Sequence, residues 1–216
     1  MRGMIGYLDV LWEAIMATAV VFLADGFEEV EALTPVDYLR RAKVCVKTVA
    51  VPTAAMKQEN LVVSSHLVPV VADLTFAEFE KEFSVSDESS LPDLVFLPGG
   101  MPGSKNLGDN EKVIAFVKKC FESGKYVSAI CAAPAVALSK TGALKGRKWT
   151  CFPEMNKDVP ADFVKDSTFV ESPFVTDGNV ITGRGAGAAE QFAMELVRLL
   201  CGKETADFLK EKTVQR

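Results

Sequence analysis

The stretch YVSAICAAP, residues 126–134, decides the fold that we predict for this chain. Residues 126–130 form a short, mostly apolar run bounded by a glycine and a turn, which is typical of a strand buried in a parallel sheet. Pro134 and the residues up to Lys140 are expected to begin a helix. The stretch therefore predicts a strand that turns directly into a helix, with Cys131 on the turn between small residues.

The same alternation of strands and helices continues on both sides of this stretch. Further strands are expected at residues 18–24, 44–51, 94–97 and 179–182. Helices are expected at residues 28–41, 75–83, 111–122 and 203–210, and another helix follows the glycine-rich run 183–187 and ends near Cys201. Strands that alternate with helices predict an α/β fold, with a mainly parallel sheet covered on both faces. We expect one domain over residues 16–216.

Several segments have a less regular pattern. Residues 61–71 predict one or two strands, and Pro69 favours an edge position, since proline cannot donate to a strand ladder. Residues 148–152 are strand-like, and residues 163–175 predict short antiparallel strands. Pro35 leaves two alternatives for the first helix: a kink, or a fresh start capped by Thr34.

Composition narrows the classes of function. The net charge is −5 and no segment clusters Lys and Arg, so we expect no nucleic-acid or membrane partner. The five cysteines are widely spaced, with no CxxC pair, which favours a reducing compartment and hence a cytoplasmic location. The single histidine, His66, makes a zinc site of the usual type unexpected, so we predict no metal.

Residues 1–15 need a separate interpretation. Asp9 and Glu13 interrupt the apolar run that a signal peptide requires, and no stretch is long enough to span a membrane. We expect an N-terminal extension or an upstream start that packs on the domain. The alternative is an amphipathic anchor or a partner helix.

Distinctive residues follow three of the predicted strands, in segments 25–31, 98–102 and 131–134. Sites in open α/β sheets form beyond the carboxyl ends of the strands, so these segments meet if their strands are neighbours. A cysteine at a helix start is expected to have a lowered pKa, and Cys131 is therefore predicted to be the most oxidisable thiol. The alternative is a buried structural cysteine. Spacing alone does not choose a catalytic carboxylate among Glu28, Glu29 and Glu31.

Four motifs taken together indicate a family. ADGFEEVEA (24–32), LPGG (97–100), AICAAP (129–134) and ITGRGAG (181–187) resemble the ThiJ/PfpI superfamily, and most of all its parkinsonism-associated protein-deglycase branch. The resemblance runs from about Met16 to the C-terminus. It implies a flavodoxin-like doubly wound three-layer sandwich, a homodimer and no cofactor. It also implies that Cys131 is the nucleophile, that Glu31 is its acid–base partner, and that Gly100 and Ala132 supply backbone N–H donors.

The chain departs from the family pattern at three places. Ala132 stands where the protease-like branch has a histidine. His66 aligns with the arginine that borders the family's site. We therefore expect both Gly99 and His66 to border the pocket, and His66 to reach it from the second copy of a dimer. Phe152 stands where some deglycases have a histidine, which weakens any mechanism that needs a third acid–base group.

A thiolate and a carboxylate in contact are expected to share one proton, with the thiolate favoured and Glu31 protonated. This pair suits a cofactor-independent enzyme of the glyoxalase III or deglycase type, acting on methylglyoxal, glyoxal or their early protein adducts. The alternatives are a redox-sensing or chaperone-like protein with an oxidisable Cys131, and a small-molecule-binding domain. The glycine fingerprint of a nucleotide site is absent after the first strand.

Overall fold

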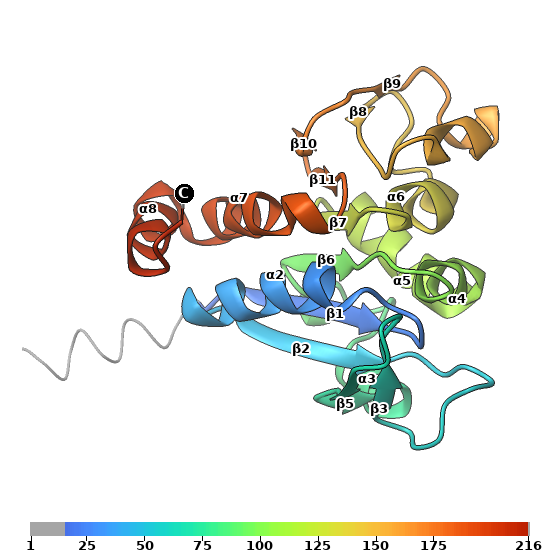
Figure 1. The fold of residues 1–216 in the computed structure, drawn as a ribbon. Coiled ribbons are helices and arrows are strands. Elements are labelled where there is room, and N and C mark those ends of the chain that lie inside the picture. Colours follow the sequence, from blue (N-terminus) through green and yellow to red (C-terminus); the bar gives the residue numbers. More distant parts are fainter. Residues whose placement is uncertain (1–15, 216) are drawn as a thin grey trace, which may run out of the picture.

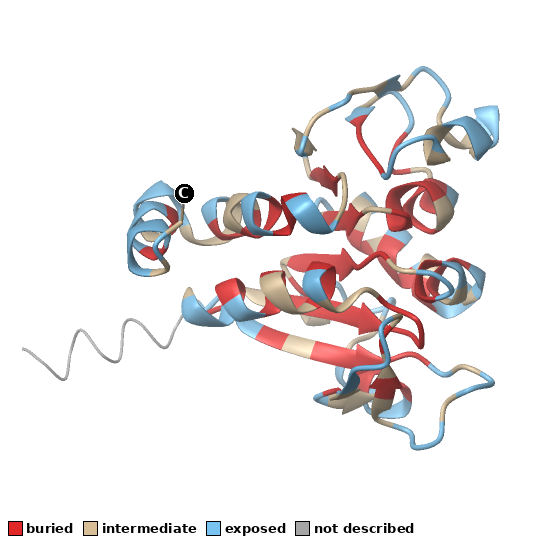
Figure 2. Cartoon of the chain, in the orientation of Figure 1, coloured by how far each residue is buried: buried red, intermediate tan, exposed pale blue. Residues whose placement is uncertain are grey.

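The first strand divides its side chains between two apolar cores. In the computed structural model, which describes residues 16–215, β1 spans Thr18–Leu23 and is buried after its first residue. Val20 and Phe22 belong to one core cluster, whereas Val21 and Leu23 belong to the other. Successive side chains of a strand point to opposite faces, so β1 must be covered on both sides. Figure 2 shows that the central strands are buried along most of their length.

Seven strands form the main sheet in the order β10-β11-β7-β6-β1-β2-β5. All neighbouring pairs are parallel except β10 and β11. The other strands of this sheet are β2 (Cys45–Ala50), β5 (Leu74–Thr75), β6 (Leu94–Leu97), β7 (Tyr126–Ile130), β10 (Phe174–Asp177) and β11 (Val180–Gly183). The predicted mainly parallel sheet is confirmed (Figure 1).

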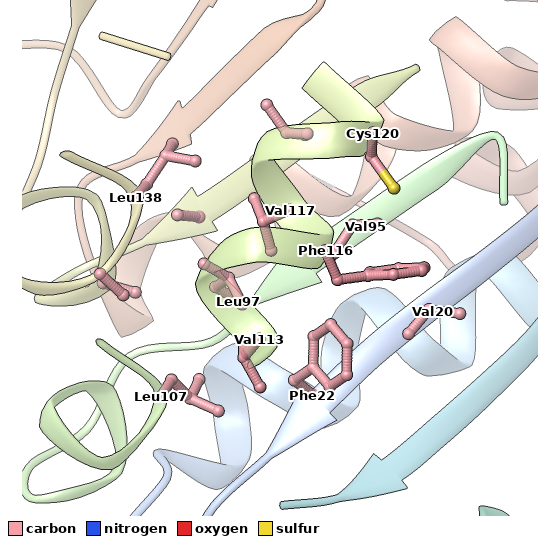
Figure 3. Close-up of a cluster of buried hydrophobic side chains, with 14 of the residues drawn as sticks. Val20, Phe22, Val95, Leu97, Leu107, Val113, Phe116, Val117, Cys120 and Leu138 are labelled. Carbon is pink, nitrogen blue, oxygen red and sulfur yellow. The ribbon is translucent and has the colours of Figure 1, made fainter. Parts of the chain in front are cut away.

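Helices cover both faces of the sheet. The face of Phe22 packs against aromatic rings of two helices: its ring centroid lies 5.0 Å from that of Phe79 and 6.0 Å from that of Phe116. Figure 3 shows Phe22 next to Phe116. The opposite face packs against α2 (Glu29–Arg41) and α7 (Ala189–Cys201), which carry Leu39 and Phe192 in the second core. The flavodoxin-like doubly wound three-layer sandwich is thus confirmed. The helices are α2 (Glu29–Arg41), α3 (Phe76–Glu82), α4 (Gly103–Asp109), α5 (Glu111–Glu122), α6 (Ala133–Val136), α7 (Ala189–Cys201) and α8 (Lys203–Lys212).

The structure resolves two alternatives and corrects some predictions. Helix α2 is continuous through Pro35, so the fresh start at Thr34 does not occur. Helix α4 was not predicted, because its sequence, GSKNLGD, has two glycines and low helix propensity. The helix predicted to run to Lys140 ends earlier, and a 3₁₀ turn follows at Leu138–Thr141.

The small strands lie outside the main sheet. Strands β3 (Leu61–Val63) and β4 (Pro69–Val71) form an antiparallel pair, which gives Pro69 the predicted edge position. Strands β8 (Lys148–Trp149) and β9 (Thr168–Phe169) pair in parallel, so the antiparallel prediction is wrong for β9. It holds for β10. The predicted N-terminal extension, residues 1–15, lies outside the described residues. No helix described in residues 16–215 has both the length and the apolar character to cross a bilayer.

Candidate functional site

The carboxyl ends of four parallel strands meet at one edge of the sheet. Strands β11, β7, β6 and β1 are consecutive neighbours. Glu31 follows β1 in the chain, Gly99 follows β6 and Cys131 follows β7 directly. The condition set by the sequence, that these strands be neighbours, is met. The structure therefore brings the three predicted segments to a single site.

Cys131 occupies a strained turn between β7 and α6. Its backbone φ is 62°, a left-handed value that a cysteine rarely adopts. Two hydrogen bonds hold this conformation: the Cys131 N–H donates to the Gly183 carbonyl at 2.9 Å, and the Phe152 N–H donates to the Cys131 carbonyl at 2.8 Å. Strain of this kind persists where the surroundings fix the backbone from several sides, and it is concentrated at functional sites.

Glu31 is the carboxylate that reaches this turn. Its residue is 1% exposed, on the first turn of α2. The Glu28 side chain caps the helix by accepting a hydrogen bond from the Glu31 N–H at 2.6 Å, and the neighbouring Glu29 faces His66. The tertiary structure thus selects Glu31 among the three glutamates.

Gly99 lies between the Glu31 carboxyl group and Cys131, where there is no room for a side chain. A Cβ placed on Gly99 would lie 2.1 Å from Glu31 Oε2 and 2.6 Å from Cys131 Cβ. Both distances are shorter than any real contact. Gly99 is therefore required for the two side chains to lie side by side, and its predicted place at the border of a pocket stays a prediction.

Burial controls the protonation of the pair. Burial raises the pKa of Glu31 to about 7, against the opposing influence of the Cys131 thiol. Burial and the charge of Glu31 also raise the pKa of Cys131, although the backbone N–H groups of Ala132 and Gly100 act in the other direction. The lowered cysteine pKa expected from the helix start is therefore wrong. The pair instead retains a proton through neutral pH.

One oxygen of the carboxyl group lacks a hydrogen-bond partner. Glu31 Oε2 is buried and accepts no hydrogen bond. An ionised oxygen in such a place is unfavourable, whereas a protonated one is a donor that needs only a nearby acceptor. Oε2 is the oxygen that faces Gly99, which also lies against Cys131, so the position suits a proton that moves between the carboxyl group and the sulfur.

The backbone N–H groups of Gly100 and Ala132, predicted as donors, lie near the Cys131 sulfur. Their N–H groups face the sulfur closely enough to favour its ionised form. Gly100 has φ of 89°, and a Cβ on it would lie 2.4 Å from the Glu28 nitrogen, so only glycine fits. The LPGG motif thus places a backbone donor next to the Cys131 sulfur.

His66 has a different environment from the one predicted. Its side chain is 67% exposed, and Nδ1 lies 2.9 Å from Glu29 Oε1 in an ion pair. A hydrogen bond with Glu29 raises the pKa of His66. His66 does not line the cavity formed by Phe152, Arg184 and Gly185. Its predicted role at a pocket across a dimer stays a prediction.

The His66 ion pair also accounts for a cluster of metal-ligand atoms. In the part of the chain from 16 to 215, Glu28, Glu29 and His66 place one such atom each within 4.8 Å of one another. Glu28 is engaged as the helix cap and Glu29 by the imidazole, so each side chain has a structural partner.

A cavity of about 630 Å³ is lined by residues that contact the Cys131 turn and Glu31, although Cys131 itself is not part of its lining. Its wall includes Phe152, whose N–H donates to the Cys131 carbonyl. The wall also includes Gly185, and a Cβ placed on Gly185 would lie 3.9 Å from Glu31 Oε1. Arg184 lines the same cavity and was missed by the sequence analysis. The signal was present, because Arg184 directly follows β11, a fourth strand end at the same edge.

The fold and site define an α/β sandwich with a cysteine at a strand-to-helix turn and a buried glutamate beside it. A family model described as the DJ-1/PfpI family matches residues 17–199, and the chain belongs to this family.

Relatives of several kinds share this similarity. The chain is 37% identical to protein DJ-1 homolog B of Arabidopsis thaliana over 195 residues, covering 90% of this chain and 40% of the relative. It is 35% identical to deglycase TK1284 of Thermococcus kodakarensis over 182 residues, covering 84% and 98%. A solved structure of the DJ-1 superfamily protein STM1931 from Salmonella typhimurium has a TM-score of 0.80 at 37% identity, covering 93% and 100%. The chain spans less than half the length of the two Arabidopsis relatives that it matches.

Proposed function

We propose that this protein is a cofactor-independent enzyme that acts on reactive dicarbonyls, such as methylglyoxal and glyoxal, or on their early adducts with proteins. The observation that carries the proposal is the buried Glu31, with a pKa of about 7, beside a cysteine on a strained turn. A carboxyl group with a pKa near the working pH both accepts and returns protons efficiently. The deglycase name of the archaeal relative supports the same class of substrate.

The first step forms a carbon–sulfur bond. The Cys131 sulfur attacks the aldehyde carbon of methylglyoxal while Glu31 takes the thiol proton. The carbonyl oxygen becomes an alkoxide beside the N–H groups of Gly100 and Ala132, which are suited to stabilise developing negative charge. Protonation of this oxygen gives a neutral hemithioacetal, and no cofactor is needed.

The second step moves hydrogen between adjacent carbons. Glu31 removes the proton from the carbon that bears sulfur, and the electron pair forms an enediol with the neighbouring carbonyl. Return of the proton to the second carbon gives a lactoyl thioester. Water then displaces the sulfur, so that methylglyoxal and one water become lactate and Cys131 is restored.

Conversion of methylglyoxal to lactate by the purified chain tests the proposal. We expect turnover by the parent and none above background by Cys131→Ser, since a hydroxyl in that position is a much weaker nucleophile. Cys45→Ser is the matched control, because Cys45 is exposed at the start of β2. Loss of turnover in Cys45→Ser, or its persistence in Cys131→Ser, would place the chemistry elsewhere.

A second candidate function is oxidation of Cys131 as a redox signal. It is favoured by the N–H groups of Gly100 and Ala132, which would also stabilise the oxygens of a sulfinate. The raised pKa of Cys131 argues against rapid reaction with peroxide, because the thiolate is the reactive form.

We also propose a cytoplasmic homodimer. Apolar side chains are exposed on α2 and around β4, at Val30, Leu67, Val68 and Val71. Val30 and Val68 line one cavity, which makes this face suited to a second copy. Sedimentation is expected to give twice the 23.4 kDa of one chain, and a particle of 23.4 kDa would contradict the dimer.

A further inference from the structure

Arg184 has hydrogen-bond donors that the protein does not use. Its Nη1 is buried without a hydrogen-bond partner. Its Nη2 lies 3.7 Å from Glu171 Oε2, and the Glu171 side chain is 79% exposed. A guanidinium group carries five N–H donors, and a long contact to an exposed carboxylate satisfies few of them. A partly buried guanidinium whose buried Nη1 has no partner calls for an explanation.

The position of Arg184 suggests a functional explanation for its unused donors. Arg184 lines the 630 Å³ cavity together with Phe152 and Gly185. These two residues connect the cavity to the reacting pair, through the hydrogen bond to the Cys131 carbonyl and the approach to Glu31 Oε1. A molecule in the cavity therefore lies beside the guanidinium and next to residues that contact the Cys131 carbonyl and Glu31.

The charges around the cavity favour an anion. Among its lining residues, all within the described chain, Arg184 is the one cation and Glu171 the one anion. Glu171 extends into solvent, whereas the Arg184 side chain is 27% exposed. Phe152, Pro153 and Pro173 supply apolar walls. A charge pair next to such walls is screened less than one in open water.

We propose that this cavity is a subsite for a carboxylate or phosphate group on the substrate, held by Arg184 while Cys131 attacks a carbonyl at the other end. The inference rests on the proposed dicarbonyl activity and narrows it to α-oxoaldehydes that carry an anionic tail. Arginine suits this role because its planar fork of donors matches the two oxygens of a carboxylate or phosphate. Methylglyoxal has no such tail and uses the carbonyl end alone.

Turnover of matched substrates tests the subsite. The probes are 4,5-dioxopentanoate, its uncharged counterpart 2-oxopentanal, and hydroxypyruvaldehyde phosphate, which separates phosphate from carboxylate. We expect Arg184→Gln to lower kcat/KM for the anionic probes by roughly tenfold and to leave 2-oxopentanal within about twofold, as expected for loss of one charged hydrogen-bonding contact.

Two further variants serve as controls for Arg184→Gln. Arg184→Lys keeps the charge and is expected to retain part of the preference for the anionic probes. Arg198→Gln removes an arginine that pairs with Glu195 on α7, and it is expected to change neither class of probe. An equal loss on charged and uncharged probes in Arg184→Gln, or no loss on either, would overturn the subsite.

Alkylation of Cys131 tests the subsite without turnover. Iodoacetate and iodoacetamide differ in charge but react with the same sulfur. We expect the iodoacetate-to-iodoacetamide rate ratio at Cys131, followed by peptide mass mapping, to fall severalfold in Arg184→Gln and to stay unchanged in Arg198→Gln. A dependence on Arg184 without dicarbonyl turnover refutes the proposed function but retains the anion subsite. Turnover without any dependence on Arg184 in either assay refutes the subsite alone.

Discussion

Replacing Glu31 with glutamine is expected to lower dicarbonyl turnover by roughly hundredfold or more, the loss associated with removing a general acid–base group. Glutamine has nearly the same size and can still donate a hydrogen bond to the sulfur. It cannot accept the thiol proton or carry a proton from one carbon to the next. Steady-state kinetics with methylglyoxal measures the effect.

The same variant separates catalysis from oxidation. Formation of a sulfinate at Cys131 needs a donor near the sulfur rather than a transferable proton. If Cys131 is a redox site, peroxide treatment long enough to offset its raised pKa is therefore expected to oxidise it in both the parent and Glu31→Gln. Peptide mass mapping locates the added oxygens. Earlier oxidation of the exposed Cys45 in the parent would count against a redox role for Cys131.

Glu31→Gln also has a consequence for stability. The pKa of Glu31 is raised from 4.5 to about 7 in the folded protein, so folding favours its protonated form. The corresponding stabilisation is fully present below pH 4.5 and is lost as the pH rises through about 7. Relative to Glu31→Gln, the parent is expected to lose up to about 3 kcal/mol of unfolding free energy across this interval. Urea unfolding of both proteins at several pH values measures the difference.

Glu29→Gln is the matched control for these experiments. It changes a glutamate of the same helix turn that faces His66 instead of Cys131. We expect it to leave dicarbonyl turnover unchanged. Turnover that survives in Glu31→Gln and fails in Glu29→Gln would show that the catalytic carboxylate has been misassigned.

Gly99→Ala is also expected to lower dicarbonyl turnover strongly. The new Cβ would lie 2.1 Å from Glu31 Oε2, 2.6 Å from Cys131 Cβ and 3.0 Å from the Ile130 carbonyl oxygen. The end of the Glu31 side chain can move away, but the other two atoms belong to the strained turn. Any relaxation therefore separates the pair. Misplacement by about 1 Å costs roughly hundredfold in rate, and overpacking costs about 1–3 kcal/mol of stability.

Gly146→Ala controls for the loss of stability. Gly146 has φ of 68° and open space where a Cβ would be, so alanine there adds about 1 kcal/mol or more of backbone strain without a contact near the site. We expect it to lower the melting temperature and to leave turnover intact. A Gly99→Ala variant with unchanged turnover would show that the pair does not depend on the close approach at Gly99.

The sequence by itself determined the strand-to-helix turn at Cys131 and the arrangement of layers. Both are local or periodic properties. Buried runs such as residues 18–23 have to be covered on both faces, and their alternation with helices leads to a parallel sheet. The convergence of three strand ends followed from this topology. The choice of Glu31 came from the family motif, because all three glutamates suit a helix start equally well.

Only the tertiary structure decided which carboxylate faces the sulfur, how the pair is protonated and what lies next to it. Glu31 is buried against Cys131 while Glu29 is engaged by His66, a residue distant from it in sequence. The local rule of a helix start predicted a lowered cysteine pKa, but burial and the nearby carboxylate raise it. Arg184 joins the site through the pairing of β11 with β7. Desolvation and contacts between distant segments arise from packing, so no local pattern of residues specifies them.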